Sequence, residues 1–598
     1  MKKTVIDGFD FYTYFKSGAD EVRKNKDDLN KINVFPVKDG DTGTNLAVTM
    51  YSIAEETTVS KDFDIVIQSM SDSAFENARG NSGIIFASFI NGFYNACGHL
   101  KTLTLEQFSL GATSGVAEAY SAVTTPVEGT MLTVIREWSE YIESNHKSHR
   151  YFSELFEGAY QKAKQVLDET PDMLEILKKN KVVDAGAKGF VTFLEGFNRL
   201  ITEIIHPSED LKNSQIGRSK LIDEHEDHLF EIPNYRYCTE VLLHDNIHDK
   251  GNIESLIEDM GDSQIVTGND RVIKIHLHTN SPDLVTKKLI EKGYHINKSK
   301  VEDMLLQTEV EMTRKSKIAV LTDSIADLSE EQILVEQIHT MPISLIADES
   351  VYLDKLTATK DNIETILNHS KSYPSSSQLE AKQVKARLEW LLSLYENVVI
   401  ISVSKALSGT YSSYEKAISE IEDGESRVVL IDSKQNSGAQ GLLVLEAAQM
   451  ANRGESLTNI VQKINEDIVK TSIYVSLDTF KYAVKGGRVP NHIGKVLMFL
   501  GAKPIMSLNK EGFGTAFGLA FSRKSIDRKI FSHVRKIANT QGIDRYAIVH
   551  ANNPELAERY KRVFEEMIGK SPIIVTEISA ITTIHAGIGA VAIAVTRR

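Results

Sequence analysis

Two carboxylates separated by a single glycine lie at the centre of the segment NVFPVKDGDTGTN, residues 33–45. Mg²⁺ prefers oxygen ligands and usually takes one or two carboxylates together with phosphate oxygens of a substrate. The glycines allow a tight turn, and a helix that begins directly after it directs free N–H groups toward an anion. The segment therefore predicts a magnesium and phosphate site at Asp39 and Asp41. A turn with two solvated aspartates is the alternative for the DGD triplet alone.

Three further glycine-bearing turns precede predicted helices in the same part of the chain. They are ARGNSG at 78–83, PVEGT at 126–130 and DAGAKG at 184–189. Each turn by itself is explained equally well as a helix cap. Together with residues 33–45 they predict that several helix N-termini converge on one phosphate-bearing ligand.

A cysteine and two histidines form a second group with metal-ligand chemistry. His276 and His278 are two residues apart in RVIKIHLHTN, so on a strand their side chains project from one face. Cys238 supplies a soft third ligand, and such a set leaves a fourth position of a Zn²⁺ ion open. The alternative is a pair of strand histidines and a buried cysteine without a metal.

The second half of the chain has hydroxyl or acidic residues directly after apolar β-type runs, at 322–324, 402–404 and 432–433. Ligands of parallel sheets bind at the carboxyl ends of the strands. Two hydroxyl-rich loops, SSSQ at 375–378 and LSGT at 407–410, offer uncharged donors suited to a carboxylate. Each loop alone is more often a turn or a cap, but together they predict one binding pocket.

Composition restricts the class of protein. The chain has 598 residues, so we expect two to four domains. Its net charge of −14 disfavours nucleic acid as a main partner, because that affinity comes largely from Lys and Arg. Its two cysteines exclude a disulfide framework and fit a reducing compartment. We found no apolar run of membrane-spanning length and no secretory signal, so we expect a cytoplasmic protein.

These groups lie on three kinds of predicted architecture. Residues 1–205 show helical periodicity, for example at 45–55, 84–97, 106–120, 151–167 and 189–204. A charged linker at 206–234 leads to a small α+β domain at 235–312. Residues 316–598 alternate β runs with helix-length segments, which predicts an α/β region with largely parallel sheets. The fold class is therefore multidomain, with an all-α part, a small α+β part and an α/β part.

The four glycine-bearing turns resemble those of the nucleotide-binding subunit of dihydroxyacetone kinase and, more closely, the kinase component of bacterial fatty-acid kinase. The resemblance spans about 8–205 and implies a helical barrel that holds ATP through Mg²⁺ bound by Asp39 and Asp41. Asn33 stands where the dihydroxyacetone enzymes have a third aspartate. The resemblance further implies nucleotide contacts at Asn45, Asn81, Ser82, Gly83, Thr130, Asp184 and Gly186.

The middle segment resembles the matching domain of the fatty-acid kinase component through its YCTE, GDS and IHLHTN motifs. That resemblance implies a metal site, with Zn²⁺ as the ion, formed by Cys238, His276 and His278 and important for activity. Glu240 and Asp262 are neighbours of this site with a weaker claim.

Residues 316–598 resemble the DegV family, the fatty-acid-binding partner of the same kinase. The motifs are TDS, PSSSQ, SKALSGTYSS, IDSK, KGGRV, AKPI and TTIHAGIGA. The resemblance implies a fatty acid whose chain lies in an apolar tunnel and whose carboxylate lies near hydroxyl groups. The substrate-binding residues that it implies are Ser376, Ser377, Ser408, Gly409, Arg523 and His585.

The sequence therefore predicts an ATP-dependent fatty-acid kinase in one polypeptide, with a long-chain fatty acid as acceptor and acyl phosphate as product. We expect a homodimer that does not span a membrane but contacts one transiently for lipid exchange. One alternative is a kinase for a small hydroxyketone with a regulatory lipid-binding half. Another is a lipid-responsive binding protein without enzymatic activity.

Overall fold

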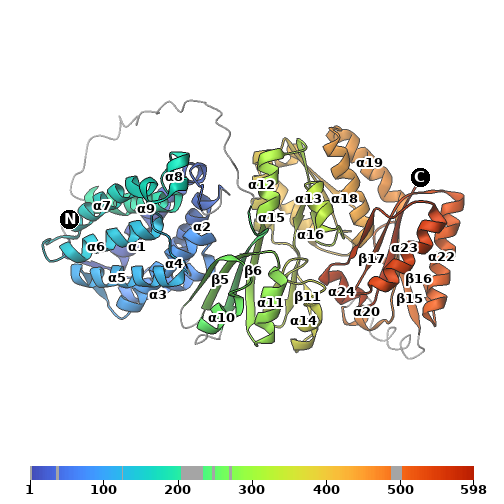
Figure 1. Cartoon of the computed structure of the whole chain (residues 1–598), viewed down its shortest axis with the longest axis horizontal. Helices are drawn as coiled ribbons and strands as arrows, with labels where there is room; N and C mark the ends of the chain where they lie inside the picture. The colour runs from blue at the N-terminus through green and yellow to red at the C-terminus, as the bar shows by residue number, and fades with distance from the viewer. Residues whose placement is uncertain are drawn as a thin grey trace. The chain divides into compact units, whose positions relative to one another are not determined.

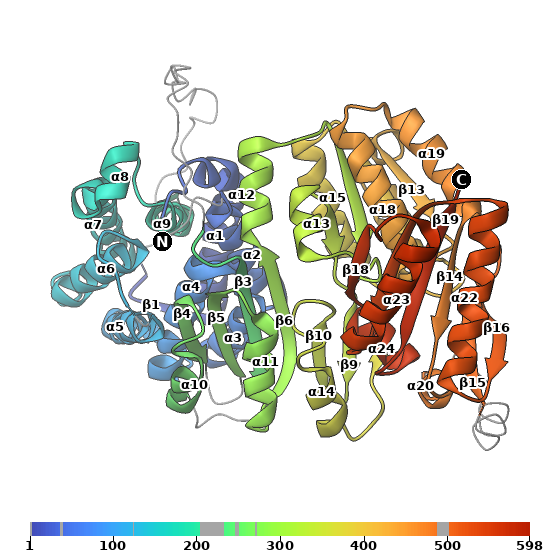
Figure 2. The ribbon, with the colours of Figure 1, turned by 45° about the vertical axis from the view of Figure 1, so that its right-hand side comes forward.

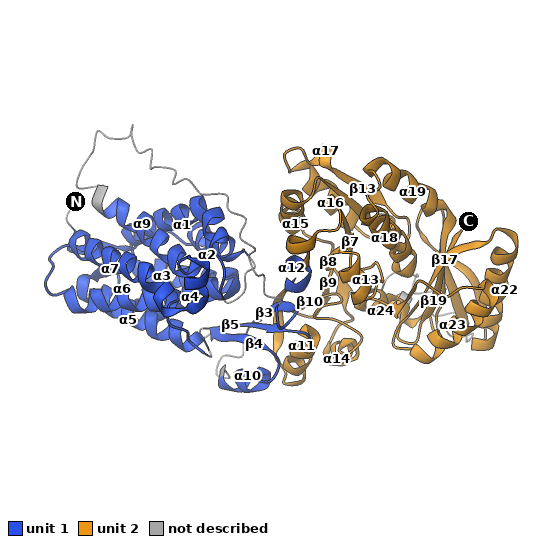
Figure 3. Cartoon of the chain, turned by 45° about the horizontal axis from the view of Figure 1, so that its top comes forward, with its two compact units in different colours: residues 1–280, 302–308 blue, residues 281–301, 309–598 orange. Residues whose placement is uncertain are grey.

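A computed structural model describes residues 3–35, 40–123, 125–203, 233–244, 250–268, 272–486 and 502–598. The chain forms two compact units (Figures 1 and 3). Unit 1 contains residues 1–280 and 302–308, and unit 2 contains residues 281–301 and 309–598. The predicted middle domain, 235–312, is thus divided between the two units.

The front of unit 1 is helical, as the periodicity predicted. Its helices are α1 (Gly8–Lys31), α2 (Thr42–Glu56), α3 (Phe63–Asn77), α4 (Gly80–Cys97), α5 (Leu105–Ala122), α6 (Met131–Asn145), α7 (Phe152–Met173), α8 (Glu175–Asn180) and α9 (Ala185–Glu203). Each helix from α1 to α7 packs on the next, α9 packs on α7, and α9 returns to α1, so the helices close into a ring. A short antiparallel pair, β1 (Val5–Asp7) and β2 (Thr102–Thr104), leads into α1 and α5, where Asp7 and Thr104 form capping boxes.

The inside of this ring is filled by aromatic side chains in edge-on and tilted contacts. Phe93 contacts Phe11, Phe63, Phe89 and Phe108, with ring centroids 5.1–6.4 Å apart. All of these rings are nearly or fully buried. Such pairs contribute about 0.5–1.5 kcal/mol each beyond their buried area, so the ring of helices has a rigid interior.

An antiparallel sheet follows the helices. Its elements are β3 (Tyr237–His244), α10 (Lys250–Ile257), β4 (Asp262–Gly268), β5 (Val272–Thr279), α11 (Pro282–Glu291), β6 (His295–Asp303) and α12 (Met304–Thr313). The strand order is β4-β5-β3-β6. Within unit 1, β3, β4 and β5 lie alongside α3 and α4 (Figure 2), and β4 packs on α4 and α5.

Unit 2 contains the predicted α/β alternation. Its strands are β7 (Ile318–Asp323), β8 (His339–Met341), β9 (Ser344–Ala347), β10 (Ser350–Leu353), β11 (Ser375–Ser376), β12 (Asn397–Ser402), β13 (Val428–Asp432), β14 (Thr471–Ser476), β15 (Lys503–Leu508), β16 (Gly514–Ala520), β17 (Ile543–His550), β18 (Ile574–Glu577) and β19 (Val591–Arg597). Its helices beyond α11 and α12 are α13 (Glu330–Val335), α14 (Ile363–His369), α15 (Ala381–Leu394), α16 (Thr410–Ser419), α17 (Gly424–Arg427), α18 (Ser437–Asn452), α19 (Leu457–Lys470), α20 (Lys481–Lys485), α22 (Arg523–Thr540), α23 (Pro554–Ile568) and α24 (Ala580–Ala586).

The prediction of largely parallel sheets is correct for one sheet of unit 2 and wrong for the other. The sheet with order β13-β12-β7-β8 is parallel. In the sheet with order β16-β15-β14-β19-β17-β18, only β17 and β18 pair in parallel. The chain enters this sheet through adjacent antiparallel strands and returns through β19, and a β run reads the same in either direction. Helix α18 packs on strands of both sheets and is buried on nearly all sides, as its apolar sequence requires.

Within the described parts of the chain, every helix is either too short or too polar to cross a lipid bilayer.

Candidate functional site

The first element of the site is the turn that ends at Asp41, immediately before α2. Gly40 has φ +64°, a backbone conformation that favours glycine. Asn45 Nδ2 donates to Asp41 Oδ2 at 2.7 Å, so the carboxylate has a fixed orientation. Thr42 Oγ1 donates to Asn33 Oδ1, also at 2.7 Å. Asp39 lies outside the described residues, and its predicted role as a metal ligand stays a prediction.

The second element is the turn between α3 and α4. Gly80 has φ +58°, and a Cβ atom there would lie 2.6 Å from Asn45 Nδ2. A Cβ atom on Gly83 would lie 2.6 Å from Thr49 Oγ1. Both glycines are therefore required for the close approach of α4 to α2. The N-termini of α2 and α4, which carry free N–H groups, meet at this point, as an anion site needs.

The third and fourth turns are joined to each other by Asp184. This buried carboxylate accepts hydrogen bonds from the backbone N–H groups of Ala187, Gly186 and Met131, which begin α9 and α6. Burial raises the pKa of Asp184 to about 6, although these bonds act in the opposite direction. Asp184 thus orders the two turns rather than presenting its charge to a ligand.

Two other residues of these turns were also predicted to contact a nucleotide. A Cβ atom on Gly186 would lie 2.9 Å from Ser82 Oγ, so the start of α9 abuts the start of α4. Thr130 is the residue before α6, and its Oγ1 donates to Val127 O at 2.7 Å. Contact of either residue with a nucleotide stays a prediction.

The cysteine and the two histidines come together through the register of β3 and β5. Cys238 pairs with His278, and Glu240 pairs with His276, so the four side chains share one face of the sheet. The ligand atoms of Cys238, His276 and His278 all lie within 4.8 Å of one another. Ligands of a tetrahedral zinc ion lie about 3.3–3.8 Å apart, so small side-chain movements complete the geometry. One thiolate and two imidazoles with an open fourth position fit Zn²⁺.

Asp262 supports this cluster from β4. Its Oδ1 lies 3.2 Å from His278 Nδ1, as in sites where a carboxylate orients a metal-binding imidazole. Burial lowers the pKa of His278, and the neighbouring Asp262 opposes that shift. A lowered pKa keeps the ring neutral near pH 7, which is the form that binds a metal.

The two predicted sites form one pocket. A cavity of about 50 Å³ is shared by the helical part and the sheet of unit 1. Its lining residues are Asn33, Phe35, Asp41, Thr42, Asn45, Gly80, Asn81, Ser82, Cys238, His276, His278 and Glu302. Nothing in the sequence indicated that the magnesium and zinc candidates would share a cavity. Glu302 was also missed, because it is a lone acidic residue in a charged stretch before α12.

In unit 2, the hydroxyl-rich loops lie against each other. A Cβ atom on Gly409 would lie 2.1 Å from Gln378 Oε1, so the loop before α16 touches the segment after β11. Ser376 is exposed on β11, and Ser377 N donates to Ser344 O at 3.0 Å. Ser408 Oγ accepts from Thr410 N at 3.2 Å.

The two predicted cationic residues are held separately in unit 2. His585 lies on α24, which packs on β11 and on α20. A Cβ atom on Gly486 would lie 2.2 Å from His585 Nδ1. Arg523 donates to Ser476 Oγ, and its NH2 lies 3.3 Å from Asp478 Oδ2 and 3.2 Å from Gly589 O, in the loop that follows α24.

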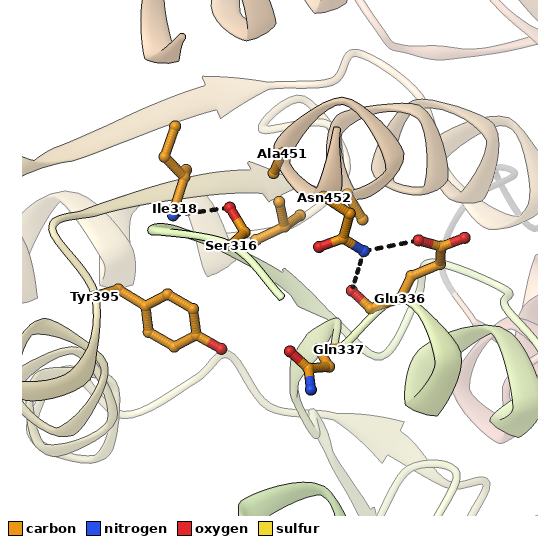
Figure 4. Close-up of a pocket in the computed structure, with 9 residues that line it drawn as sticks. Ser316, Ile318, Glu336, Gln337, Tyr395, Ala451 and Asn452 are labelled. Carbon is orange, nitrogen blue, oxygen red and sulfur yellow. Dashed lines mark hydrogen bonds between the residues drawn. The ribbon is translucent and has the colours of Figure 1, made fainter. Parts of the chain in front are cut away.

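A small cavity in unit 2 lies between β7 and α18 (Figure 4). Its volume is about 10 Å³, enough for at most about one water molecule. At its edge Asn452 Nδ2 donates to Glu336 Oε2 at 2.8 Å and to Glu336 O at 3.3 Å. None of the residues predicted to bind substrate lines it, so we assign it no function.

Three protein families match successive parts of the chain. Residues 36–199 match the DAK2 domain. Residues 234–311 match the FakA-like middle domain of fatty acid kinase. Residues 317–598 match the DegV family. One chain carries all three domains. This combination is the architecture of a fatty-acid kinase, and the first two domains mark a kinase-type enzyme.

Similar proteins come from several bacteria. An uncharacterized protein of Staphylococcus haemolyticus is 32% identical over 328 residues, which are 52% of this chain and 58% of that protein. A Mycoplasma pneumoniae protein is 29% identical over 63% of this chain and 72% of its own length. A protein of Staphylococcus aureus strain USA300 is 26% identical over 78% of this chain and 90% of its own length. The chain thus spans less than two thirds of the first of these relatives.

Solved structures resemble the DegV domain. DegV of Bacillus subtilis, described as a fatty acid binding protein, is 25% identical and covers 47% of this chain and 100% of its own, with a TM-score of 0.42. A DegV family protein of Thermus thermophilus, described by its fatty acid binding, is 22% identical over 47% of this chain and 99% of its own, with a TM-score of 0.43.

Proposed function

We propose that this protein is a fatty-acid kinase that transfers the γ-phosphoryl group of ATP to the carboxylate of a fatty acid held by its DegV domain. The observation that carries the proposal is the pocket of unit 1, in which Asp41, the start of α4 and the Cys/His cluster line one cavity. The presence of DAK2, kinase-type middle and DegV domains in one chain supports the same reaction.

The donor half of the reaction is assigned to unit 1. Asp41, together with Asp39, holds Mg²⁺, which joins the protein to the β- and γ-phosphates. The free N–H groups at the start of α4, with Asn81 and Ser82, bind phosphate oxygens. Asn45 fixes Asp41 by its hydrogen bond, so the carboxylate needs no reorientation when the nucleotide binds.

The Cys/His cluster contributes the second charge of the pocket. A zinc ion held by Cys238, His276 and His278 would supply a fixed positive charge beside the phosphates. The protein's own contribution is to keep both imidazoles neutral by burial and to orient His278 through Asp262.

The acceptor half is assigned to unit 2. Ser376, Ser377, Ser408 and Gly409 belong to the two loops that touch through Gln378, and they bind the carboxylate of the fatty acid. His585 and Arg523 supply positive charge for the acyl phosphate. Burying a chain of about fourteen methylenes is worth roughly 11 kcal/mol, which accounts for a dedicated lipid-binding domain.

The reaction needs orientation and charge neutralisation more than it needs a base. A fatty carboxyl group has a pKa of about 4–5 in water and is ionised at pH 7. One carboxylate oxygen forms a bond to Pγ while the bond between Pγ and the β,γ-bridging oxygen breaks, and ADP leaves with those electrons. The products are an acyl phosphate and ADP. We further propose that the protein acts as a cytoplasmic homodimer that contacts membranes transiently to exchange lipid.

The test uses the purified full chain. Lipids extracted from it are identified by mass spectrometry, and the loaded protein is then incubated with Mg-ATP and hydroxylamine. Conversion of bound fatty acid to its hydroxamate is the expected result. Turnover only with dihydroxyacetone would indicate a small-molecule kinase instead. Bound lipid without turnover on either acceptor would indicate a lipid-responsive binding protein.

A further inference from the structure

A buried ion pair connects the sheet of unit 1 to the turn between α3 and α4. Glu240 on β3 and Lys274 on β5 have side chains only 3% and 7% exposed, and their charged atoms lie 3.0 Å apart. Lys274 was not singled out in the sequence, although it continues the two-residue spacing of His276 and His278. A buried pair is seldom retained for stability alone, because the loss of hydration offsets most of the attraction.

The two charged groups bind the backbone of the turn on both sides of Arg79. Glu240 Oε1 accepts from Gly80 N at 2.9 Å, and Lys274 Nζ donates to Ala78 O at 3.0 Å. Gly80 N belongs to the first turn of α4, where backbone donors have no partner within the helix. The ion pair therefore fixes the position from which Asn81 and Ser82 enter the pocket.

The same turn continues to the magnesium candidate. Gly80 lies against Asn45, and Asn45 Nδ2 holds Asp41 Oδ2. In the other direction, Glu240 faces the Cys/His cluster, because it pairs with His276 across the strands and its Oε1 lies 3.9 Å from His276 Nδ1. A continuous set of contacts thus joins the cluster, the ion pair, the turn and Asp41.

We infer that Glu240 and Lys274 are positioning residues that hold the 78–82 turn in its nucleotide-binding geometry and connect it to the Cys/His strands. This inference rests on the proposed function, because it assumes that the pocket binds a nucleotide. It assigns Glu240 to the backbone of the turn rather than to the metal. It requires a carboxylate acceptor on β3 and an ammonium donor on β5, each in its own place.

The experiment measures the Kd of Mg-ADP by calorimetry, the Tm without nucleotide and the zinc content of the full chain. Glu240→Met should raise the Kd by about tenfold or more while zinc content stays at the wild-type value. Glu240→Gln keeps an acceptor for Gly80 N and should raise the Kd less. Arg236→Met is the control, because Arg236 pairs with Asp303 by the same sheet without touching the turn.

The double variant Glu240→Met/Lys274→Met separates positioning from stability. It removes both buried charges, so its Tm should recover relative to Glu240→Met, but its Kd should stay raised. A Kd that returns to the wild-type value in the double variant, or one that Glu240→Met does not change, would overturn the inference. Wild-type protein that binds no Mg-ADP would instead contradict the proposed function. Because the double variant leaves no buried charge unpaired, it also serves if Glu240→Met does not fold.

Discussion

The pocket of unit 1 and the candidate head-group residues of unit 2 hold their polar side chains in different ways. In unit 1, Asp41 is held by Asn45, and the buried Glu240 is held by Lys274 and Gly80 N. In unit 2, Ser376 is exposed at the end of the short strand β11. The first arrangement suits phosphates that must be aligned before transfer. The second suits a ligand that has to enter and leave.

The largest effect that would sharpen this comparison is expected from Asp41. Asp41→Asn should lower acyl phosphate formation by about 100-fold or more, because an amide is a poor ligand for Mg²⁺. Fatty acid that co-purifies with the protein should stay at the wild-type amount, measured by mass spectrometry. Asp28→Asn is the matched control, since Asp28 is an exposed aspartate of α1. Equal loss of bound lipid in the Asp41 variant would contradict a division of labour between the units.

Loss of the Cys/His cluster should have the next largest effect. Cys238→Ser should lower both zinc content, measured by atomic emission, and acyl phosphate formation, the latter by about tenfold or more. Cys97→Ser is the control, because Cys97 is the chain's other cysteine and lies in the helical core. A Cys238 variant that has lost its zinc but turns over at the wild-type rate would remove the cluster from the catalytic pocket.

The two hydroxyl-rich loops of unit 2 should show the opposite pattern. Ser376→Ala combined with Ser408→Ala should weaken fatty-acid binding by about tenfold, because hydrogen bonds to a charged group contribute about 1.5–3 kcal/mol each. The Kd of Mg-ADP should not change. Ser393→Ala, at an exposed serine of α15, provides the control. Unchanged lipid affinity in the double variant, measured by displacement of a fluorescent fatty acid, would place the carboxylate elsewhere.

The smallest effect concerns stability and pH. Because burial raises the pKa of Asp184 from 3.8 to about 6, the folded protein binds more protons than the unfolded chain between these values. The free energy of unfolding should therefore fall as pH rises from about 4 to 6, by at most about 3 kcal/mol from this group. Asp184→Asn should remove that part of the slope in urea titrations. An identical slope in the variant would show that Asp184 is ionised in the folded protein throughout.

Much of the site was visible in the sequence because its chemistry is local. Asp41, Asn45, Ser82 and the cluster of Cys238, His276 and His278 stand in short motifs whose spacing predicts a turn before a helix or one face of a strand. Glu240 also stood in its motif, but its role depends on the register of β3 against β5, which spacing alone does not determine.

The features that the sequence did not reveal depend on packing between distant segments. The approach of the sheet to α4 places His276 in the same cavity as Asp41 and brings Lys274 to Ala78 O. Glu302 joins that cavity from a segment that has no motif. The direction of the strands in the second sheet of unit 2 was also missed, since an apolar β run carries no information on whether its neighbour is parallel.

The central claim is that the carboxylate oxygen of a fatty acid attacks the γ-phosphorus of ATP. The most direct test supplies palmitate labelled with ¹⁸O in its carboxyl group, together with Mg-ATP and hydroxylamine, and analyses the released phosphate by mass spectrometry. Hydroxylamine attacks the acyl carbon, so the bridging oxygen leaves with phosphorus, and each phosphate should carry one ¹⁸O atom. Phosphate without ¹⁸O would mean that water is the acceptor, and the assignment as a fatty-acid kinase would be wrong.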